Sequence, residues 1–177
     1  MDREEEIARA RYSLEGHPHL QPFLAFMVEL SKETDRGMAL IATSYIDDML
    51  RQTIAAFLIG GEASKSLLEG FNAPLGTLST RIAAAAALGL ISEREAKEAD
   101  RLRKIRNFFA HHVHISFDDQ NIRDLCGNLE MAAQDYGDVV VNTRGRFSTS
   151  AVALIMNLTN RPHYVGQERL QPRAWTY

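Results

Sequence analysis

The stretch SEREAKEADRLRKIRNFFAHH, residues 92–112, decides the fold of the region around it. Ser92 is followed three residues later by Glu95, the spacing of a capping box in which each side chain binds the other residue's backbone amide. Acidic residues come early and basic residues late, as the helix dipole favours. An apolar stripe recurs at helical spacing through Ala99, Leu102, Ile105 and Phe109. We predict a helix that starts at this capping box and ends near His111 or His112.

Similar patterns on both sides of this stretch predict further helices. We expect them at residues 22–33, 35–59 with Asp35 as N-cap, a short one at 62–69, from Thr77 or Ser79 to 88, from Asp118 or Asp119 to 129, and 147–158. Residues 162–177 are expected to be irregular, and the apolar run 139–141 is too short to assign. The predicted fold class is all-α, a single-domain multi-helix bundle of about six helices. Its predicted parts are a charged N-terminal segment (1–20), a helical domain (21–160) and a C-terminal tail (161–177).

Composition limits the kind of protein this chain can be. The 177 residues carry a formal net charge of −3, which argues against a protein built around neutralising nucleic-acid phosphates. Cys126 is the only cysteine, so the chain can form neither an internal disulfide nor a cysteine-based zinc cluster. The first residues are charged, and no apolar run approaches the ~20 residues that span a bilayer. We therefore expect a cytoplasmic protein that does not enter a membrane.

The densest group of chemically capable side chains lies at the end of the opening stretch. Arg106 could stabilise charge on a phosphoryl oxygen and His111 could transfer a proton, so the pair could cleave RNA without a metal. Five helical steps, however, place the two residues about 140° apart. They converge only if the helix ends or distorts before His111, or if a second subunit completes the site. The alternative is electrostatic, with these bases favouring a helix C-terminus and His111 capping its carbonyls.

Other groups of residues suggest structural roles. His111, His112 and His114 lack the spacing that places two metal ligands on one helical face, so we expect no metal. No GxGxxG or Walker loop appears, and we expect no other cofactor. Asp47 and Asp48 are expected to form salt bridges with Arg106 or Arg103. We expect Cys126 to be a small core residue.

A DNA-reading motif is not expected. Ala85 and Gly89 have a spacing found in helix-turn-helix motifs, but the second helix of such a motif would turn acidic residues, including Glu93, toward phosphate. Direct DNA binding is therefore not part of the predicted function.

The sequence resembles the mannitol operon repressor family over residues 35–158. The resemblance is carried by SYIDDMLRQTIAAFL, the loop GFNAPLGTLSTRI, the segment ALGLISEREAKEADRLRKIRNFFAH, ISFDDQNIRDLC and FSTSAVALIMNL, with the loop and RKIRNFFAH the most specific. It implies an all-helical domain that represses transcription through a protein partner. The first 34 residues and the tail lie outside it.

The segment from Arg106 to His111 also resembles the motif of HEPN domains, helical proteins that include dimeric, metal-independent ribonucleases. The resemblance matches Arg106 and His111 to that family's catalytic pair and Asn107 to the polar residue beside the arginine. Many HEPN proteins have no activity.

The sequence thus favours a non-enzymatic regulator with a protein partner. The alternative is a HEPN-type endoribonuclease, with RNA as substrate, or an inactive toxin–antitoxin relative. The regulator and the ribonuclease are each compatible with a homodimer.

Overall fold

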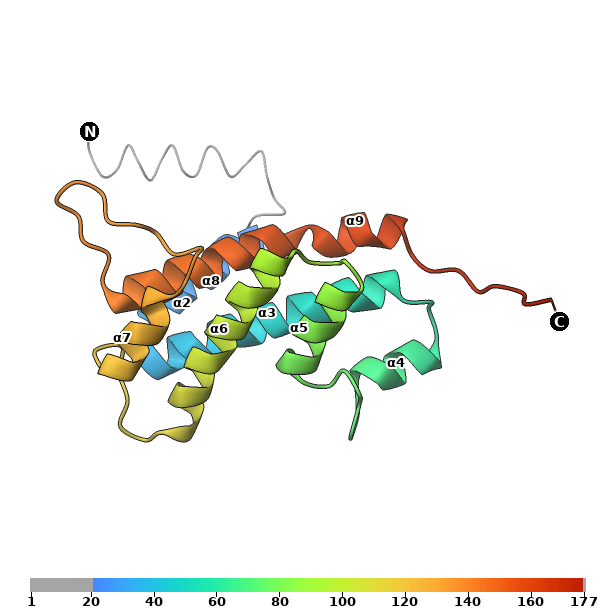
Figure 1. The fold of residues 1–177 in the computed structure, drawn as a ribbon, viewed down its shortest axis with the longest axis horizontal. Coiled ribbons are helices and arrows are strands. Elements are labelled where there is room, and N and C mark those ends of the chain that lie inside the picture. The colour runs from blue at the N-terminus through green and yellow to red at the C-terminus, as the bar shows by residue number, and fades with distance from the viewer. Residues whose placement is uncertain (1–20, 177) are drawn as a thin grey trace. The chain divides into compact units, whose positions relative to one another are not determined.

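The computed structural model describes residues 21–176, which form two compact units divided after Thr34. The described part of the first unit holds α2 (Gln21–Lys32), close to the helix predicted at 22–33. The second unit contains seven helices: α3 (Asp35–Phe57), α4 (Glu62–Leu68), α5 (Leu78–Ala87), α6 (Glu93–His111), α7 (Gln120–Gly127), α8 (Thr143–Thr159) and α9 (Arg161–Gln167). Figure 1 shows this order. Between residues 21 and 176 the structure has no strand beyond one isolated bridge, Tyr136 to Val139, which confirms the all-α fold class.

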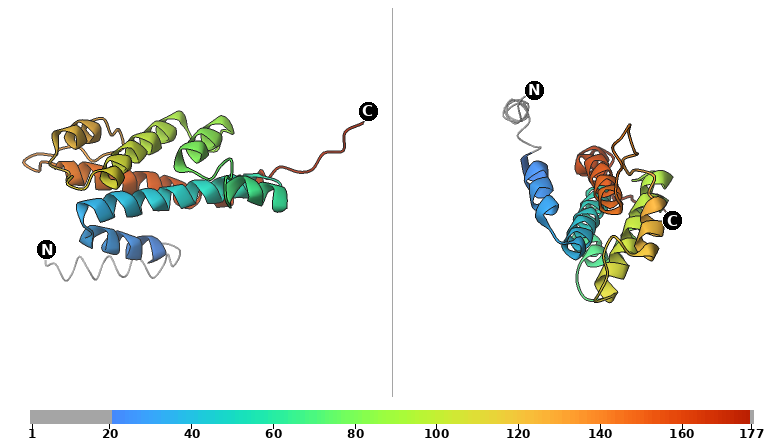
Figure 2. Two further views of the ribbon diagram at one scale, coloured as in Figure 1. Left: turned by 90° about the horizontal axis from the view of Figure 1, so that it is seen from below. Right: turned by 90° about the vertical axis from the view of Figure 1, so that its left-hand side faces the viewer.

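Helix α3 is the centre of the second unit. It packs against α5, α6, α8 and α9, and Figure 2 shows α8 running alongside it. Burial on several sides requires an apolar surface wider than one stripe. The chain supplies this surface with fully or almost fully buried side chains: Met38, Ala39, Ala42, Ile46, Leu50 and Ile54. Two buried hydroxyls, those of Thr43 and Thr53, donate hydrogen bonds to carbonyls one turn earlier, so these polar groups are satisfied inside the core.

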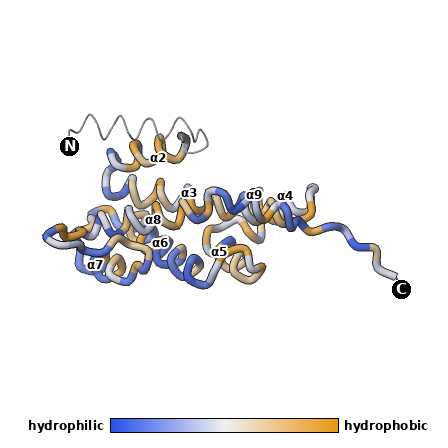
Figure 3. Tube along the Cα trace, turned by 90° about the horizontal axis from the view of Figure 1, so that it is seen from above, coloured by the Kyte–Doolittle hydropathy of each residue, from blue (hydrophilic) through white to orange (hydrophobic). Residues whose placement is uncertain are grey.

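Helices α5 and α6 begin where the sequence predicts, because both have local caps. Thr77 and Thr80 form a capping box at α5, and Ser92 and Glu95 form one at α6. Gly89, with a φ of 71°, reverses the chain between the two helices, a conformation that favours glycine. The predicted stripe of α6 is buried, since Leu102, Ile105 and Phe109 have no exposed surface. Figure 3 shows hydrophobic and hydrophilic residues alternating along the helices of this unit.

The C-terminal region departs from the prediction in two places. Helix α8 begins at Thr143 rather than 147, because the Asn142 side chain accepts a hydrogen bond from the Gly145 amide and caps the helix early. The expectation of an irregular chain from residue 162 is wrong up to residue 167, since α9 covers residues 161–167, and it is confirmed for residues 168–176. Pro162 suits the first turn of a helix, where a missing amide costs no hydrogen bond. Arg161 anchors this start by donating to Glu95 and to the Leu90 carbonyl, both at 2.7 Å.

The described helices are all too short or too polar to cross a membrane.

Candidate functional site

Helix α6 carries the residues that the sequence singles out, and its buried stripe fixes which way they face. Ile105 and Phe109 face the core, so the neighbouring positions lie at the edge of the packed surface. Arg106 and Asn107 are partly buried there, while His111 is exposed. The predicted candidates therefore occupy two different environments on one helix.

Arg106 and Asn107 line a cavity of about 420 Å³ between α3, α5 and α6. Its walls come from Asp47 in α3, from Arg103 in α6, and from the loop and first turn that start α5. The four residues of that last wall are Gly76, Thr77, Leu78 and Ser79. Gly76 is required by close packing, because a Cβ atom at this position would lie 2.9 Å from the Ala73 carbonyl oxygen.

The charged groups of this cavity differ in how they are paired. The Arg103 guanidinium binds the Asp100 carboxylate, with Nη2 to Oδ1 at 2.6 Å. The side chains of Arg106 and Asn107 make no hydrogen bond or ion pair with any residue among 21–176. Arg106 thus contributes a positive charge that no carboxylate in the described chain compensates.

The predicted salt bridges from Asp47 and Asp48 to Arg106 or Arg103 are not formed. Asp47 binds Arg81, with Nη1 to Oδ2 at 2.8 Å, and its Oδ1 is buried without a partner in the described chain. Asp48 binds Arg51 within its own helix. Burial would raise the pKa of Asp48, but the hydrogen bonds from Arg51 and Gln52 outweigh burial and lower that pKa below its ordinary value.

Arg81, which the sequence analysis did not assign, holds the wall of the cavity in place. It is 8% exposed, and its guanidinium donates to the carbonyls of Leu75 at 2.8 Å and Leu68 at 3.0 Å while it binds Asp47. One buried cation thus connects α3, the end of α4 and the loop before α5. The same loop presents Phe71, which is 97% exposed.

His111 does not line the cavity. Helix α6 continues through His111 without a break, so the side chains of Arg106 and His111 leave it about 140° apart. Convergence of the two side chains within one chain would require the helix to end or distort before His111, and it does neither. The predicted capping by His111 is also absent: His112 lies beside the Phe108 carbonyl, with Nδ1 to O at 3.0 Å, and its ring stacks on that of Phe108.

The segment that follows His111 is held by the start of α3. Arg36 donates to the carbonyls of His112 and Val113, and the Phe117 amide donates to Asp35 at 3.1 Å. These contacts join residues more than 75 positions apart, and no local pattern in the sequence could indicate them.

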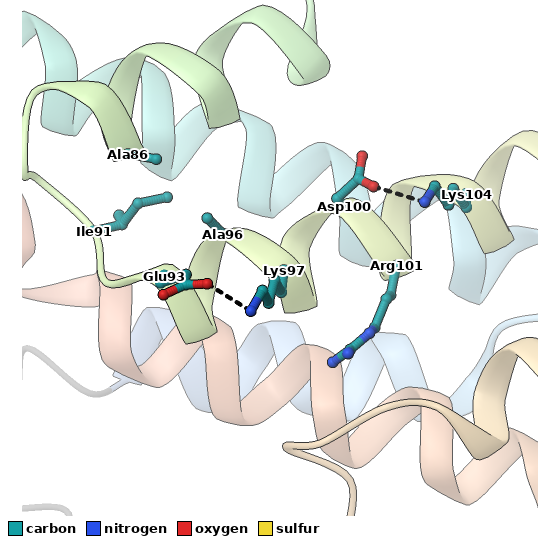
Figure 4. Close-up of a pocket in the computed structure, with 8 residues that line it drawn as sticks. All are labelled: Ala86, Ile91, Glu93, Ala96, Lys97, Asp100, Arg101 and Lys104. Atoms are coloured by element: carbon teal, nitrogen blue, oxygen red, sulfur yellow. Dashed lines mark ion pairs between the residues drawn. The ribbon is translucent and has the colours of Figure 1, made fainter.

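A second cavity, of about 610 Å³, lies between the end of α5 and the outer face of α6 (Figure 4). Its charged residues are already paired. Lys97 binds Glu93 at 2.6 Å, Lys104 binds Asp100 at 3.0 Å, and Arg101 binds Glu98 and Glu130. Each charged side chain of this lining therefore has an oppositely charged partner, and none is left unpaired to select a ligand.

Metal-ligand types and the cysteine are distributed as follows in the described chain. Residues 21–176 contain no group of three or more His, Cys, Asp or Glu that could hold a metal ion. Cys126 is buried in α7, as predicted, and burial raises the pKa of its thiol to about 12.

No model of a known protein family matches the chain, and a comparison with curated proteins finds no match. Among solved structures, the chain is similar to a chain in an X-ray structure of the MtlR-HPr complex from Escherichia coli. The two share 21% sequence identity, with a TM-score of 0.55, over 80% of this chain and 99% of that chain. At this identity the likeness establishes a shared helical fold.

Proposed function

We propose that this protein is a regulator related to the mannitol operon repressors, and that it represses transcription through a protein partner. The observation that carries the proposal is the fold likeness to a chain of the MtlR-HPr complex, which extends over nearly the whole of that chain. The sequence resemblance over residues 35–158 supports the same proposal independently.

The surface of helices α5 and α6 supports a role without direct DNA reading. Glu93 opens α6, where a recognition helix would present residues to the DNA, and it is exposed. Glu95 and Glu98 are turned into the core. An exposed carboxylate at this end of the helix would repel phosphate, so we expect the purified protein to bind DNA without sequence preference, or not at all.

Two loops offer contact points for a partner. Phe71 is almost fully exposed on the loop before α5, and the loop between α7 and α8 exposes Tyr136, Val139 and Val140. Figure 3 shows hydrophobic residues at the tip of this second loop. Exposed aromatic and aliphatic side chains that gather on a loop are typical of protein interaction surfaces.

By analogy with the complex, HPr is the first partner to test. We expect isothermal titration calorimetry to detect binding between this protein and the HPr of the organism that encodes it. Phe71→Ala and Tyr136→Ala should each leave the unfolding midpoint unchanged, because the side chains are exposed, and a loss of affinity in one of them identifies the loop used. Absence of HPr binding, together with tight sequence-specific DNA binding, would contradict the proposal.

A second proposal, a HEPN-type ribonuclease, is supported by Arg106 and Asn107, which line a cavity without partners. Since Arg106 and His111 diverge on one helix, such a site would need His111 from a second copy. In that case Arg106 would stabilise the phosphorane-like transition state and His111 would transfer the proton of the attacking 2′-hydroxyl.

A mixing experiment tests this second proposal. Arg106→Ala and His111→Ala should each abolish RNA cleavage, whereas mixed dimers of the two variants should recover part of it, because one of their two sites keeps both residues. Wild-type protein that is verified as folded and leaves mixed RNA intact would rule out the ribonuclease.

A further inference from the structure

The cavity between α3, α5 and α6 contains a cation that no other group in the described chain neutralises. Asp47 is bound to Arg81, and Arg103 shares the Asp100 carboxylate with Lys104, so each of these lining charges has an oppositely charged partner. Arg106 remains with its guanidinium unpaired on the cavity wall, and the Asn107 amide beside it is also without a partner among residues 21–176. Arg106 and Asn107 are partly exposed side by side on this wall, so both groups are available to a ligand in the cavity.

We propose that this cavity is a receptor for a small anionic ligand, a phosphate or phosphomonoester, held by Arg106 and Asn107. The planar fork of a guanidinium matches the oxygens of a phosphate, and an amide NH₂ adds a further donor. The cavity volume of about 420 Å³ lies within the range of small-molecule sites.

The wall that α5 contributes favours an anion over a cation. The first turn of α5 supplies this wall, and Thr77 already accepts the amides of Thr80 and Arg81. The amides of Leu78 and Ser79 have no acceptor in the described chain. Amides at the start of a helix carry partial positive charge, which adds to that of Arg106.

The single carboxylate in the lining does not oppose this. Asp47 directs Oδ2 to Arg81 and keeps Oδ1 buried, so its charge is neutralised by a contact outside the cavity. His111 lies outside the cavity, so the site has no proton-transferring group of its own chain and is suited to binding rather than to cleavage.

The proposal stands independently of HPr binding and of ribonuclease activity, and its test involves neither. Amide chemical shifts of ¹⁵N-labelled protein are followed by NMR during titration with inorganic phosphate, glycerol 3-phosphate, glycerol and a ten-nucleotide oligouridylate, with chloride holding ionic strength constant. We expect phosphate and glycerol 3-phosphate to move the amides of Leu78, Ser79 and Asn107 in a saturable way. Glycerol should have no effect.

The variants separate this site from general attraction to a basic helix. Arg106→Gln removes the guanidinium, and Asn107→Asp places a negative charge at constant size; each should weaken phosphate binding at least about tenfold. Lys104→Gln removes a cation from the same helix that is paired with Asp100 and lies outside this cavity, and it should bind phosphate like the wild type. Thermal unfolding verifies that each variant is folded, and Asn107→Ser replaces Asn107→Asp if the latter unfolds.

Saturable binding that both cavity variants lose and Lys104→Gln keeps supports the receptor. The proposal is overturned if neither phosphate compound shifts these amides, if Arg106→Gln binds as tightly as the wild type, or if only the oligouridylate binds.

Discussion

The Glu98 carboxylate of α6 accepts a hydrogen bond of 2.6 Å from the Ser150 hydroxyl of α8 in the interior of the protein, where neither side chain is exposed. The same carboxylate accepts the amides of Glu130 and Met131 and binds Arg101. A buried carboxylate is costly unless its oxygens are satisfied, and this one is satisfied by two helices and the loop after α7.

We predict that Glu98→Gln lowers the free energy of unfolding by about 2 to 3 kcal/mol, because the new NH₂ group faces backbone donors and the charge that binds Arg101 is lost. Ser150→Ala should cost only about 1 kcal/mol, since it removes one donor of four. Urea unfolding at neutral pH measures both. Glu93→Gln, on the exposed face of the same helix, is the control and should lose much less stability, because it removes only an exposed ion pair with Lys97; equal losses in Glu98→Gln and Glu93→Gln would contradict the central role of Glu98.

Arg81 should be as important to the loop before α5 as Glu98 is to the loop after α7. Arg81→Ala leaves Asp47 without its partner and two carbonyls without donors, so we expect a loss of about 3 kcal/mol. Arg81→Lys keeps the charge but cannot reach both carbonyls, so it should lose less stability than Arg81→Ala. Adding Asp47→Asn to Arg81→Ala should recover part of the stability, because the uncompensated carboxylate is then removed. A double-mutant cycle by urea unfolding checks this, and strictly additive losses would exclude the coupling.

Local signals in the sequence predicted the helices well, and long-range contacts explain the errors. The capping box of Ser92 and Glu95 involves residues three apart, so the start of α6 could be predicted from spacing alone. Helix α9 could not, because Arg161 is anchored on Glu95, 66 residues earlier in the chain. The cap at Asn142 precedes the first buried apolar residue of α8, Phe147, by five positions, so apolar periodicity placed the helix start too late.

In the candidate site, too, local features could be predicted from the sequence and long-range contacts could not. The sequence identified Arg106 and Asn107 as unusual but assigned Asp47 or Asp48 to pair with Arg106 or Arg103. Charge alone cannot specify which arginine lies nearest to a given aspartate, and in the fold the buried Arg81 forms the ion pair with Asp47. The wall formed by the first turn of α5 depends on how α5 packs against α6, which no local pattern encodes.

Stability should fall at acid pH in part through Glu95. Burial would raise the pKa of Glu95, but hydrogen bonds from the Ser92 amide and from Arg161 outweigh it and hold that pKa below its ordinary value. A lowered folded-state pKa means that the ionised carboxylate stabilises the protein above its unfolded pKa of about 4.3, and that this contribution is lost as pH falls through the folded value.

We therefore expect Glu95→Gln to be less stable than the wild type at pH 6, and the difference to shrink by pH 3. Urea midpoints at the two pH values measure it. A difference that is constant or grows toward pH 3 would show that the ionised form of Glu95 does not carry this stabilisation.

The Cys126 thiol should report on unfolding of the core around α7. It is buried, and a pKa of about 12 leaves roughly one thiol in ten thousand as thiolate at pH 8, where an ordinary cysteine is ionised to about a quarter. Because the thiolate is the reactive form, we expect native protein to react with a disulfide reagent such as DTNB at least about a thousandfold more slowly than urea-unfolded protein. The rate should rise with urea, since opening of α7 exposes the sulfur and restores an ordinary pKa.

Glu98→Gln, which loosens the loop that follows α7, should speed the native reaction, while Glu93→Gln should not. Rapid labelling of native wild-type protein would mean that α7 opens readily without global unfolding, and would place the Glu98 contacts outside the stable core.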